Sequence, residues 1–186
     1  GRHVQREGYE AAVDSGVKFV NISPRRCDME SSGDPEWIPI RPNSDTAMLL
    51  ALCHTLRAEG LADESFLASH CTGYDRFGDY LEGKDDGVSK TAEWAADLTG
   101  IDAATITGLA REMASKRTMV SLSWSLTRQQ FGEQPYWAGI ALAAMLGQIR
   151  TESGGVGFGY AIANHIGNNM RHVPYPTFPQ GRNSVK

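Results

Sequence analysis

Two long segments of the chain are apolar on almost every face of a predicted helix. Residues 46–59 carry an unbroken apolar run from Ala47 to Cys53, followed by Leu56. Residues 135–149 are nearly as apolar, and Pro135 lies in the first turn, where its missing N–H does no harm. A helix that is hydrophobic all round is expected to be buried. The pattern therefore places these two helices at the centre of the core.

Shorter helices alternate with short extended segments. Helices are predicted over residues 5–15, 63–70, 92–98 and 102–114, the last with Asp102 as N-cap, and strands over 17–22, 37–40 and 118–123. Pro39 makes the second strand an edge strand or no strand. Residues 82–90 are expected to form an exposed loop and residues 154–159 a flexible, glycine-rich stretch. The alternation predicts an α/β fold with an open, mostly parallel sheet and helices on both faces.

Composition and charge exclude several classes of protein. The 186 residues are 41% hydrophobic and 22% charged, and the net charge of −4 argues against a nucleic-acid partner. No apolar run reaches the roughly 18 residues of a membrane span. The three cysteines form no metal-binding or disulfide pattern, so free thiols are expected.

Polar residues follow two of the predicted strands, at the edge where open α/β sheets bind ligands. After the first strand, Ser23, Pro24 and Arg25 offer a hydroxyl and a guanidinium that suit a ribose or a phosphate. The alternative is a strand ended by proline and followed by a solvated basic turn. Before the most buried helix, Asp45 has a carboxylate that can accept two N–H donors from a guanine edge. The alternative is that Ser44 or Asp45 is an ordinary N-cap.

The segment after the third strand, residues 124–134, has an unusual composition. It combines an indole, a fixed cation and three glutamines ahead of a buried helix. Trp124 and Arg128 would together bind a flat, polar heterocycle with a charged tail. The alternative is a packed Trp124 with Arg128 and Glu133 on the surface.

No catalytic motif accompanies these segments. The glycines of residues 154–159 do not make G-x-G-x-x-G after a strand, and we expect them to let the backbone pass close to a bulky ligand or another domain. The five histidines show no H-E-x-x-H or triad-like context, and no nucleophile elbow is present. From the residues alone we predict a nucleotide-binding α/β domain, with neither a catalytic residue nor a metal ligand.

Several segments, in this order and spacing, resemble a known family. Residues 20–26 (VNISPRR) and 37–47 (WIPIRPNSDTA) resemble the paired signature of molybdopterin oxidoreductases. Residues 121–128 (SLSWSLTR), with 132–135 and 144–149, are similar to the branch that reduces dimethyl sulfoxide, trimethylamine N-oxide and biotin sulfoxide. The tail segments 157–160, 174–176 and 179–183 fit the same branch. One departure is the sequence RTESGG at 150–155, where relatives commonly have GLPGGG.

The resemblance implies a bis(molybdopterin guanine dinucleotide) molybdenum centre that takes an oxygen atom from an S-oxide or N-oxide. It implies that residues 1–150 bind part of this cofactor and that 151–186 are a Gly/Pro-rich segment connecting to the next domain. The molybdenum ligand would lie outside this chain. Carried over by position, the cofactor-binding residues are Ser23, Pro24, Arg25, Pro42, Asn43, Asp45, Trp124, Leu126, Arg128 and Gln129.

The same resemblance implies partners and a location. The partners are a small S-oxide or N-oxide substrate, the remaining domains of the same polypeptide, and an electron-donor protein or reductant. The implied role is anaerobic respiration in the periplasm, with the cytoplasm as the alternative. Two other functions remain open: a general nucleotide-binding domain, such as that of an NAD-linked dehydrogenase, and a non-catalytic interaction module. The absence of G-x-G-x-x-G counts against the dehydrogenase.

Overall fold

The computed structural model describes residues 2–26, 34–152 and 154–158. Its elements, in chain order, are α1 (Arg2–Asp14), β1 (Val20–Ile22), β2 (Glu36–Ile38), α2 (Asp45–Ala58), α3 (Glu64–His70), α4 (Tyr74–Leu81), α5 (Ala92–Thr99), α6 (Ala103–Ser115), β3 (Met119–Leu122), the 3₁₀ helix η2 (Trp124–Arg128), α7 (Gln134–Met145) and β4 (Gly155–Phe158). Residues 27–33, with Cys27, and most of the predicted connecting segment 151–186, from residue 159 on, lie outside the described residues.

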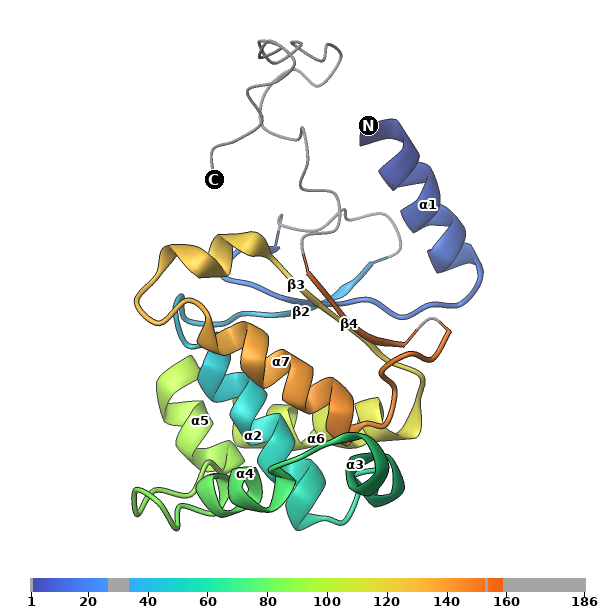
Figure 1. Ribbon diagram of the computed structural model, residues 1–186. Coiled ribbons are helices and arrows are strands. Elements are labelled where there is room, and N and C mark those ends of the chain that lie inside the picture. The colour runs from blue at the N-terminus through green and yellow to red at the C-terminus, as the bar shows by residue number, and fades with distance from the viewer. Residues whose placement is uncertain (1, 27–33, 153, 159–186) are drawn as a thin grey trace, which may run out of the picture.

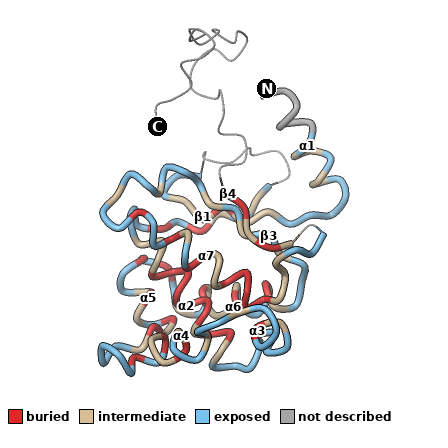
Figure 2. Tube along the Cα trace, in the orientation of Figure 1, coloured by how far each residue is buried: buried red, intermediate tan, exposed pale blue. Residues whose placement is uncertain are grey.

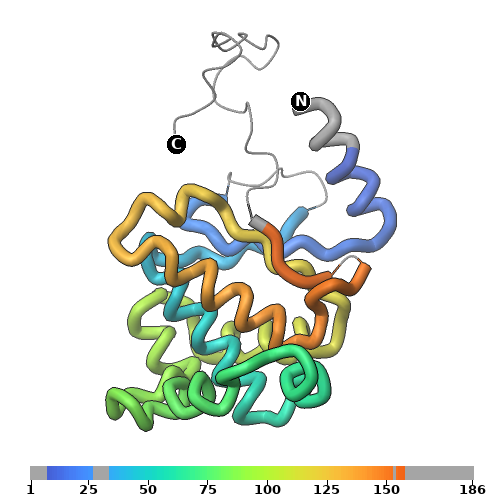
Figure 3. Tube along the Cα trace, viewed as in Figure 1, coloured from blue at the N-terminus to red at the C-terminus, as the bar shows by residue number. Residues whose placement is uncertain are grey.

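All strand pairing in the described residues is parallel, as predicted. β1 pairs with β2, with Ile22 opposite Ile38, and β3 pairs with β4, with Leu122 opposite Phe158. The strands are only three or four residues long, and the pairing is divided between two two-stranded sheets. Although far apart in sequence, both sheets lie on the same side of helices α2 to α7 (Figure 3). α1 lies on the other side of the strands (Figure 1), and the predicted α/β class is confirmed.

The core is organised around α2. Every residue from Ala47 to Cys53 is buried, as is Leu56, which confirms the prediction from the apolar run. α5, α6 and α7 each pack against α2, and the buried parts of the chain gather where these helices meet (Figure 2). A single cluster of buried side chains extends from Ile38 to Leu146. The helical layer therefore forms the support on which the strands and their connecting turns rest.

α4 was not predicted. Its sequence holds Gly78 in the middle, and glycine is a poor helix former. The structure explains the glycine: a Cβ at this position would overlap the guanidinium of Arg57, which reaches across α4 to Glu82 with Nε and Oε1 2.9 Å apart. The contact between α2 and α4 has here outweighed the low helix propensity of glycine.

The loop 82–90 is largely exposed, as expected, but its last residue is not. Lys90 is only 2% exposed, and its Nζ lies 2.7 Å from an Asp86 carboxylate oxygen and 4.4 Å from the centre of the Tyr80 ring. The buried charge is thus paired within its own loop and stabilised by an aromatic face. The charged, glycine-containing sequence of this loop gave no sign of this arrangement.

The prediction of a flexible glycine stretch at 154–159 is wrong for the residues that the structure describes. Gly155–Phe158 form β4, and the Gly155 N–H donates to the carbonyl of Thr118 at 3.0 Å. Glycine is usually unfavourable in a strand, but here it lets the backbone pass close to Gln148. Cys53 is buried and Cys71 is half-buried, and both are free thiols. None of the described helices is long and apolar enough to cross a membrane.

Candidate functional site

The turn after β1 carries the first predicted group of site residues. The Ser23 N–H donates to the carbonyl of Ile38 at 3.3 Å, and the Ser23 carbonyl accepts from the Trp37 indole N–H at 3.0 Å. The Ser23 hydroxyl donates to the Arg25 carbonyl at 2.7 Å. Pro24 and Arg25 are exposed. This network fixes the turn at the carboxyl end of β1 against the end of β2, and among the described residues no group donates to the Ser23 hydroxyl.

Asn21 supports the same turn and was missed by sequence reasoning. It is 7% exposed, and its side-chain amide lies 3.4 Å from the carbonyl of Arg26. A buried amide needs hydrogen-bond partners, so it holds the following turn back against the strand. The sequence signal that could have revealed it is that Asn21 is a single polar residue between the apolar Val20 and Ile22 of the predicted strand.

The second predicted group lies in a tight turn between β2 and α2. The Ser44 N–H donates to the Arg41 carbonyl at 3.3 Å, with Pro42 and Asn43 between them. Asn43 has φ +69°, and a proline followed by a left-handed residue is the pattern of a type II turn. Pro42 therefore shapes the turn, and both Pro42 and Asn43 are exposed.

Arg41 anchors this turn on α5, a role that sequence reasoning did not find. Its guanidinium donates to the Asp97 carbonyl at 2.6 Å and its backbone N–H donates to the Thr99 carbonyl at 2.9 Å. Cations are favourable near the carboxyl end of a helix. No local signal in the sequence connects residue 41 with a helix more than fifty positions later.

Asp45 is the first residue of α2 and is half-buried. Burial raises the pKa of its carboxyl group, and the described residues contribute no cation that would offset this. The Ser44 hydroxyl donates to the Arg41 carbonyl at 2.7 Å and makes no capping hydrogen bond to the helix. Ser44 is therefore the N-cap residue of α2 by position, as the alternative has it, but its side chain does not cap the helix. The start of α2 combines an acceptor carboxylate with N–H groups that have no partner inside the helix.

The third predicted group lies in and just after η2. Trp124 is 54% exposed and Arg128 is also exposed, while Leu126 and Gln129 are half-buried. The alternative of a packed Trp124 is thus incorrect, and that of a surface Arg128 is correct. An indole face and a guanidinium are both presented to solvent from one short helix.

Backbone contacts hold η2 to the start of α7. The Tyr136 hydroxyl donates to the Ser123 carbonyl at 2.8 Å. Gly132 lies so close to η2 that a Cβ there would be 2.5 Å from the Leu126 carbonyl oxygen. Because this neighbour is backbone, the loop conformation depends on the glycine. The close approach of Gly132 and the Tyr136 hydrogen bond together hold η2 against the start of α7.

A hollow of about 430 Å³ lies between η2 and α7, and we call it the η2–α7 hollow. Its lining residues are Trp124, Thr127, Glu133, Tyr136, Trp137 and Ile140. Most of the exposed lining is apolar, since two indoles, a phenol ring and an isoleucine contribute to it. Such a surface suits an aromatic ring or an apolar segment.

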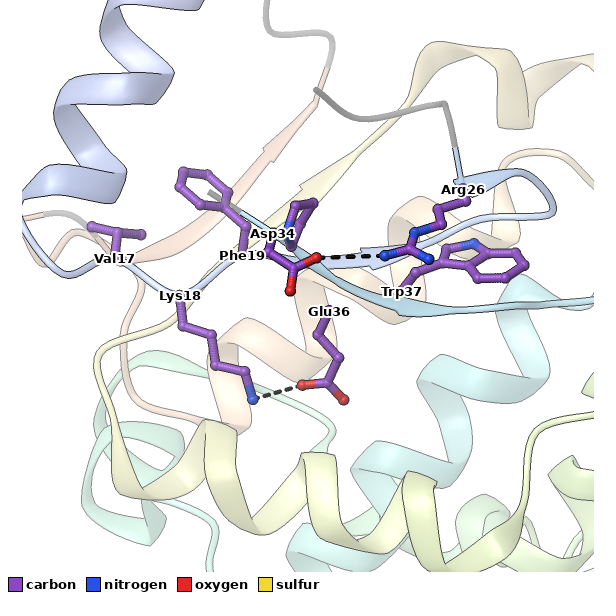
Figure 4. A pocket seen from close by; sticks show the side chains of 8 residues that line it. Val17, Lys18, Phe19, Arg26, Asp34, Glu36 and Trp37 are labelled. Atoms are coloured by element: carbon purple, nitrogen blue, oxygen red, sulfur yellow. Dashed lines mark hydrogen bonds and ion pairs between the residues drawn. The ribbon is translucent and has the colours of Figure 1, made fainter. Parts of the chain in front are cut away.

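A second hollow, of about 440 Å³, lies beside the amino-terminal ends of β1 and β2 (Figure 4). Its charged side chains are paired: Lys18 Nζ is 2.7 Å from a Glu36 carboxylate oxygen, and Arg26 is 3.4 Å from Asp34. Lys18 also pairs with Glu112 at 2.7 Å. These pairs join the strands to α6, so we interpret this hollow as structural.

The three predicted segments lie at the carboxyl ends of strands, on the same side of the molecule (Figure 1). The hydrogen bonds of Ser23 join the first segment to the end of β2. The described residues contain no group of three or more His, Cys, Asp or Glu side chains that could hold a metal ion. The contacts of the ten predicted residues with a cofactor stay a prediction.

Comparison with known proteins finds relatives of this chain. The family model described as "Molybdopterin oxidoreductase" matches residues 3–184. A biotin sulfoxide reductase of Cereibacter sphaeroides is 41% identical over 90% of the chain and 22% of its own length. A trimethylamine-N-oxide reductase of Haemophilus influenzae is 43% identical over 81% of the chain and 18% of its own length. Trimethylamine-N-oxide reductase 1 of Escherichia coli K12 is 51% identical over 66% of the chain and 14% of its own length.

One solved structure supports the fold. Acetylene hydratase from Pelobacter acetylenicus superimposes with a TM-score of 0.68, covering 77% of this chain and 19% of its own, at 23% sequence identity. The chain spans about a fifth of the length of the relatives it matches.

Proposed function

Because this chain belongs to the molybdopterin oxidoreductase family, we propose that it is a cofactor-binding domain of a larger enzyme that reduces an S-oxide or N-oxide. The family implies a molybdenum–molybdopterin cofactor. We propose that the cofactor has the bis(molybdopterin guanine dinucleotide) form, and that this chain binds the nucleotide arm of one pterin. When bound, the molybdenum centre supplies the redox chemistry that removes an oxygen atom from the substrate.

The observation that carries the proposal is the half-buried, cation-free carboxylate of Asp45 at the start of α2. Guanine presents two adjacent N–H donors on one edge, and a carboxylate accepts both. Such a pair of hydrogen bonds would offset the burial of the charge, which a backbone hydrogen bond within the described residues offsets only in part. Asn43, in the preceding turn, is exposed beside it and would contact the same base.

The other predicted residues fit the remaining parts of a dinucleotide. Ser23, Pro24 and Arg25 would line the ribose and guanine region, with lone pairs of the Ser23 hydroxyl available to accept. Trp124, Leu126 and Arg128 would contact a pterin or its phosphates, with Gln129 in reach. An exposed indole and an exposed guanidinium suit a flat heterocycle and an anion respectively.

The test is to replace Asp45 by Asn in the full-length protein, produced in a molybdenum-replete host. The amide keeps the shape of the side chain but can accept only with its oxygen, and its NH₂ group opposes the guanine donors. The wild-type protein is expected to contain about one molybdenum and two GMP per chain after acid extraction. The Asp45→Asn variant is expected to lose a large part of both.

Asp102→Asn is the matched control. Asp102 is an exposed carboxylate at the N-cap position of α6 whose side chain makes no capping hydrogen bond. Its replacement should leave molybdenum and GMP at wild-type levels. Wild-type protein with neither molybdenum nor GMP would overturn the proposal and favour the non-catalytic interaction module. Equal cofactor content in Asp45→Asn and wild type would overturn the role of Asp45 alone.

The resemblance also motivates a proposal about the cellular role. We propose that the enzyme serves anaerobic respiration in the periplasm and receives electrons from a donor protein. Fractionation of anaerobically grown cells, followed by an immunoblot of the full-length protein, tests the location. Recovery with the cytoplasmic fraction would contradict it.

A further inference from the structure

The 3₁₀ helix η2 has little packing of its own. None of its five residues is buried. Its hydrogen bonds are short-range: the Leu126 N–H donates to the Ser123 carbonyl at 3.3 Å. The Thr127 hydroxyl likewise donates to the Trp124 carbonyl at 2.8 Å. Because short 3₁₀ helices have poor hydrogen-bond geometry and segments with few buried contacts open easily, η2 depends on a neighbouring element to keep one conformation.

Tyr136, in the first turn of α7, gives this support. Its hydroxyl donates to the Ser123 carbonyl at 2.8 Å. Burial raises the pKa of the phenol, and a hydrogen bond with the Thr127 backbone lowers it in part. The phenol is therefore protonated at neutral pH and can donate, while its oxygen can accept from the Thr127 N–H. One hydroxyl group thus contacts the backbone near both ends of η2.

The two contact points adjoin the residues that would bind the cofactor. Ser123 directly precedes Trp124, and Thr127 directly precedes Arg128. Trp124 is 54% exposed and Arg128 is also exposed, so neither side chain is held in place by burial. The direction in which each side chain leaves η2 therefore depends on the backbone that carries it. A hydrogen bond at each preceding residue constrains that backbone.

α7 is a firm base for this contact. It packs against α2, α3, β3 and β4. Pro135 and Leu142 are fully buried. Gly139 lies so close to β3 that a Cβ there would be 2.6 Å from Leu122 Cδ1. Tyr136 therefore connects η2, which has no buried residue, to a helix that belongs to the core.

We propose that Tyr136 is a positioning residue for the cofactor, and that its hydroxyl holds η2 in the conformation from which Trp124 and Arg128 bind a pterin or its phosphates. This role rests on the proposed function, since it requires a bound cofactor. Tyr136 acts through these two residues. A site that is held in its binding conformation loses less conformational entropy on binding, so it retains its ligand better.

Tyr136→Phe in the full-length holoenzyme tests the proposal, because it removes the hydroxyl and keeps the ring. The rate at which the purified protein loses molybdenum and GMP is measured at one temperature below its melting transition. We expect this rate to rise about three- to tenfold, which corresponds to the loss of one neutral hydrogen bond. Tyr74→Phe is the matched control, because the Tyr74 hydroxyl donates to the Glu64 carboxylate at 3.3 Å, between α4 and α3. It should leave the rate unchanged.

The same substitution in a variant with Trp124→Ala and Arg128→Ala separates positioning from a general loss of stability. If Tyr136 acts through these two side chains, removing its hydroxyl should add no further loss of cofactor once they are absent. A destabilised fold would release cofactor faster in both backgrounds. An equal rise in both backgrounds, no rise in either, or an equal rise in Tyr74→Phe would each overturn the proposal.

Hydrogen exchange of the cofactor-free, full-length protein covers the case in which the background variant holds too little cofactor to follow. In Tyr136→Phe, amides of residues 124–128 should exchange about three- to tenfold faster than in wild type, while those of α2 exchange at the wild-type rate. Unchanged exchange in η2, or equal acceleration in α2, would overturn the proposal. Wild-type protein with neither molybdenum nor GMP would overturn the proposed function and this role with it. A loaded wild type with an unchanged Tyr136→Phe variant would overturn this role alone.

Discussion

We expect the half-buried carboxylate of Asp45 to lower the stability of the folded chain. Burial raises the pKa of this group in the folded chain above its value in the unfolded chain. The ionised form is therefore disfavoured on folding, and stability falls as the pH rises through the folded-state pKa. Residues that serve binding commonly carry such a cost.

At the residue scale, we expect Asp45→Asn to stabilise the cofactor-free chain near pH 7 while reducing cofactor binding. The neutral amide removes the desolvation of the charge, so thermal unfolding should shift upward. The gain should disappear as the pH falls toward about 3, where the wild-type carboxyl is protonated in both states. Melting curves of the two proteins across this pH range measure the effect. A variant that is less stable than wild type at neutral pH would contradict it.

At the element scale, the connection from η2 to α7 depends on Gly132. An added Cβ would lie 2.5 Å from the Leu126 carbonyl oxygen and 2.7 Å from the Thr127 carbonyl carbon. We expect Gly132→Ala to cost about 1–3 kcal/mol in the free energy of unfolding, as overpacking does elsewhere. Urea denaturation measures this. Gly108→Ala is the control, because nothing lies within 4 Å of its Cβ on α6 and alanine should stabilise that helix by about 0.5–1 kcal/mol.

The elements also show where sequence reasoning succeeds and where it stops. The long apolar run of α2 is a local pattern, and its burial follows from that pattern alone. α4 was missed because its central residue, Gly78, is explained by a contact with Arg57, which lies on another helix. β4 was missed because its two glycines lower the strand propensity of its sequence, and the strand is held by pairing with β3. The sequence predicted that the candidate site lies at the ends of three strands. It did not predict that Asn21 and Arg41 hold the turns of this site, because they do so through contacts that no sequence pattern shows.

At the scale of the whole molecule, one core joins the helices to the strands. Leu56 is fully buried near the end of α2, within the cluster that extends from Ile38 to Leu146. We expect Leu56→Ala to lower the free energy of unfolding by about 2–5 kcal/mol. Because the core is continuous, circular dichroism and tryptophan fluorescence should report one coincident transition in urea. Leu98→Ala, at an exposed position on α5, should change little; a comparable loss there, or two separated transitions, would contradict this view of the core.

The parallel pairing of β3 with β4 sets an order in which the chain can be completed during its synthesis. The strand partners are separated by η2 and α7, and a parallel pair cannot close until such a crossover has formed. On the ribosome, β3 emerges first, and its backbone groups that later pair with β4 stay unpaired while α7 is synthesised. The helices around α2 can assemble in that interval, but the edge of β3 stays open to wrong pairing. The glycine-rich strand β4 is the segment whose arrival ends that exposure.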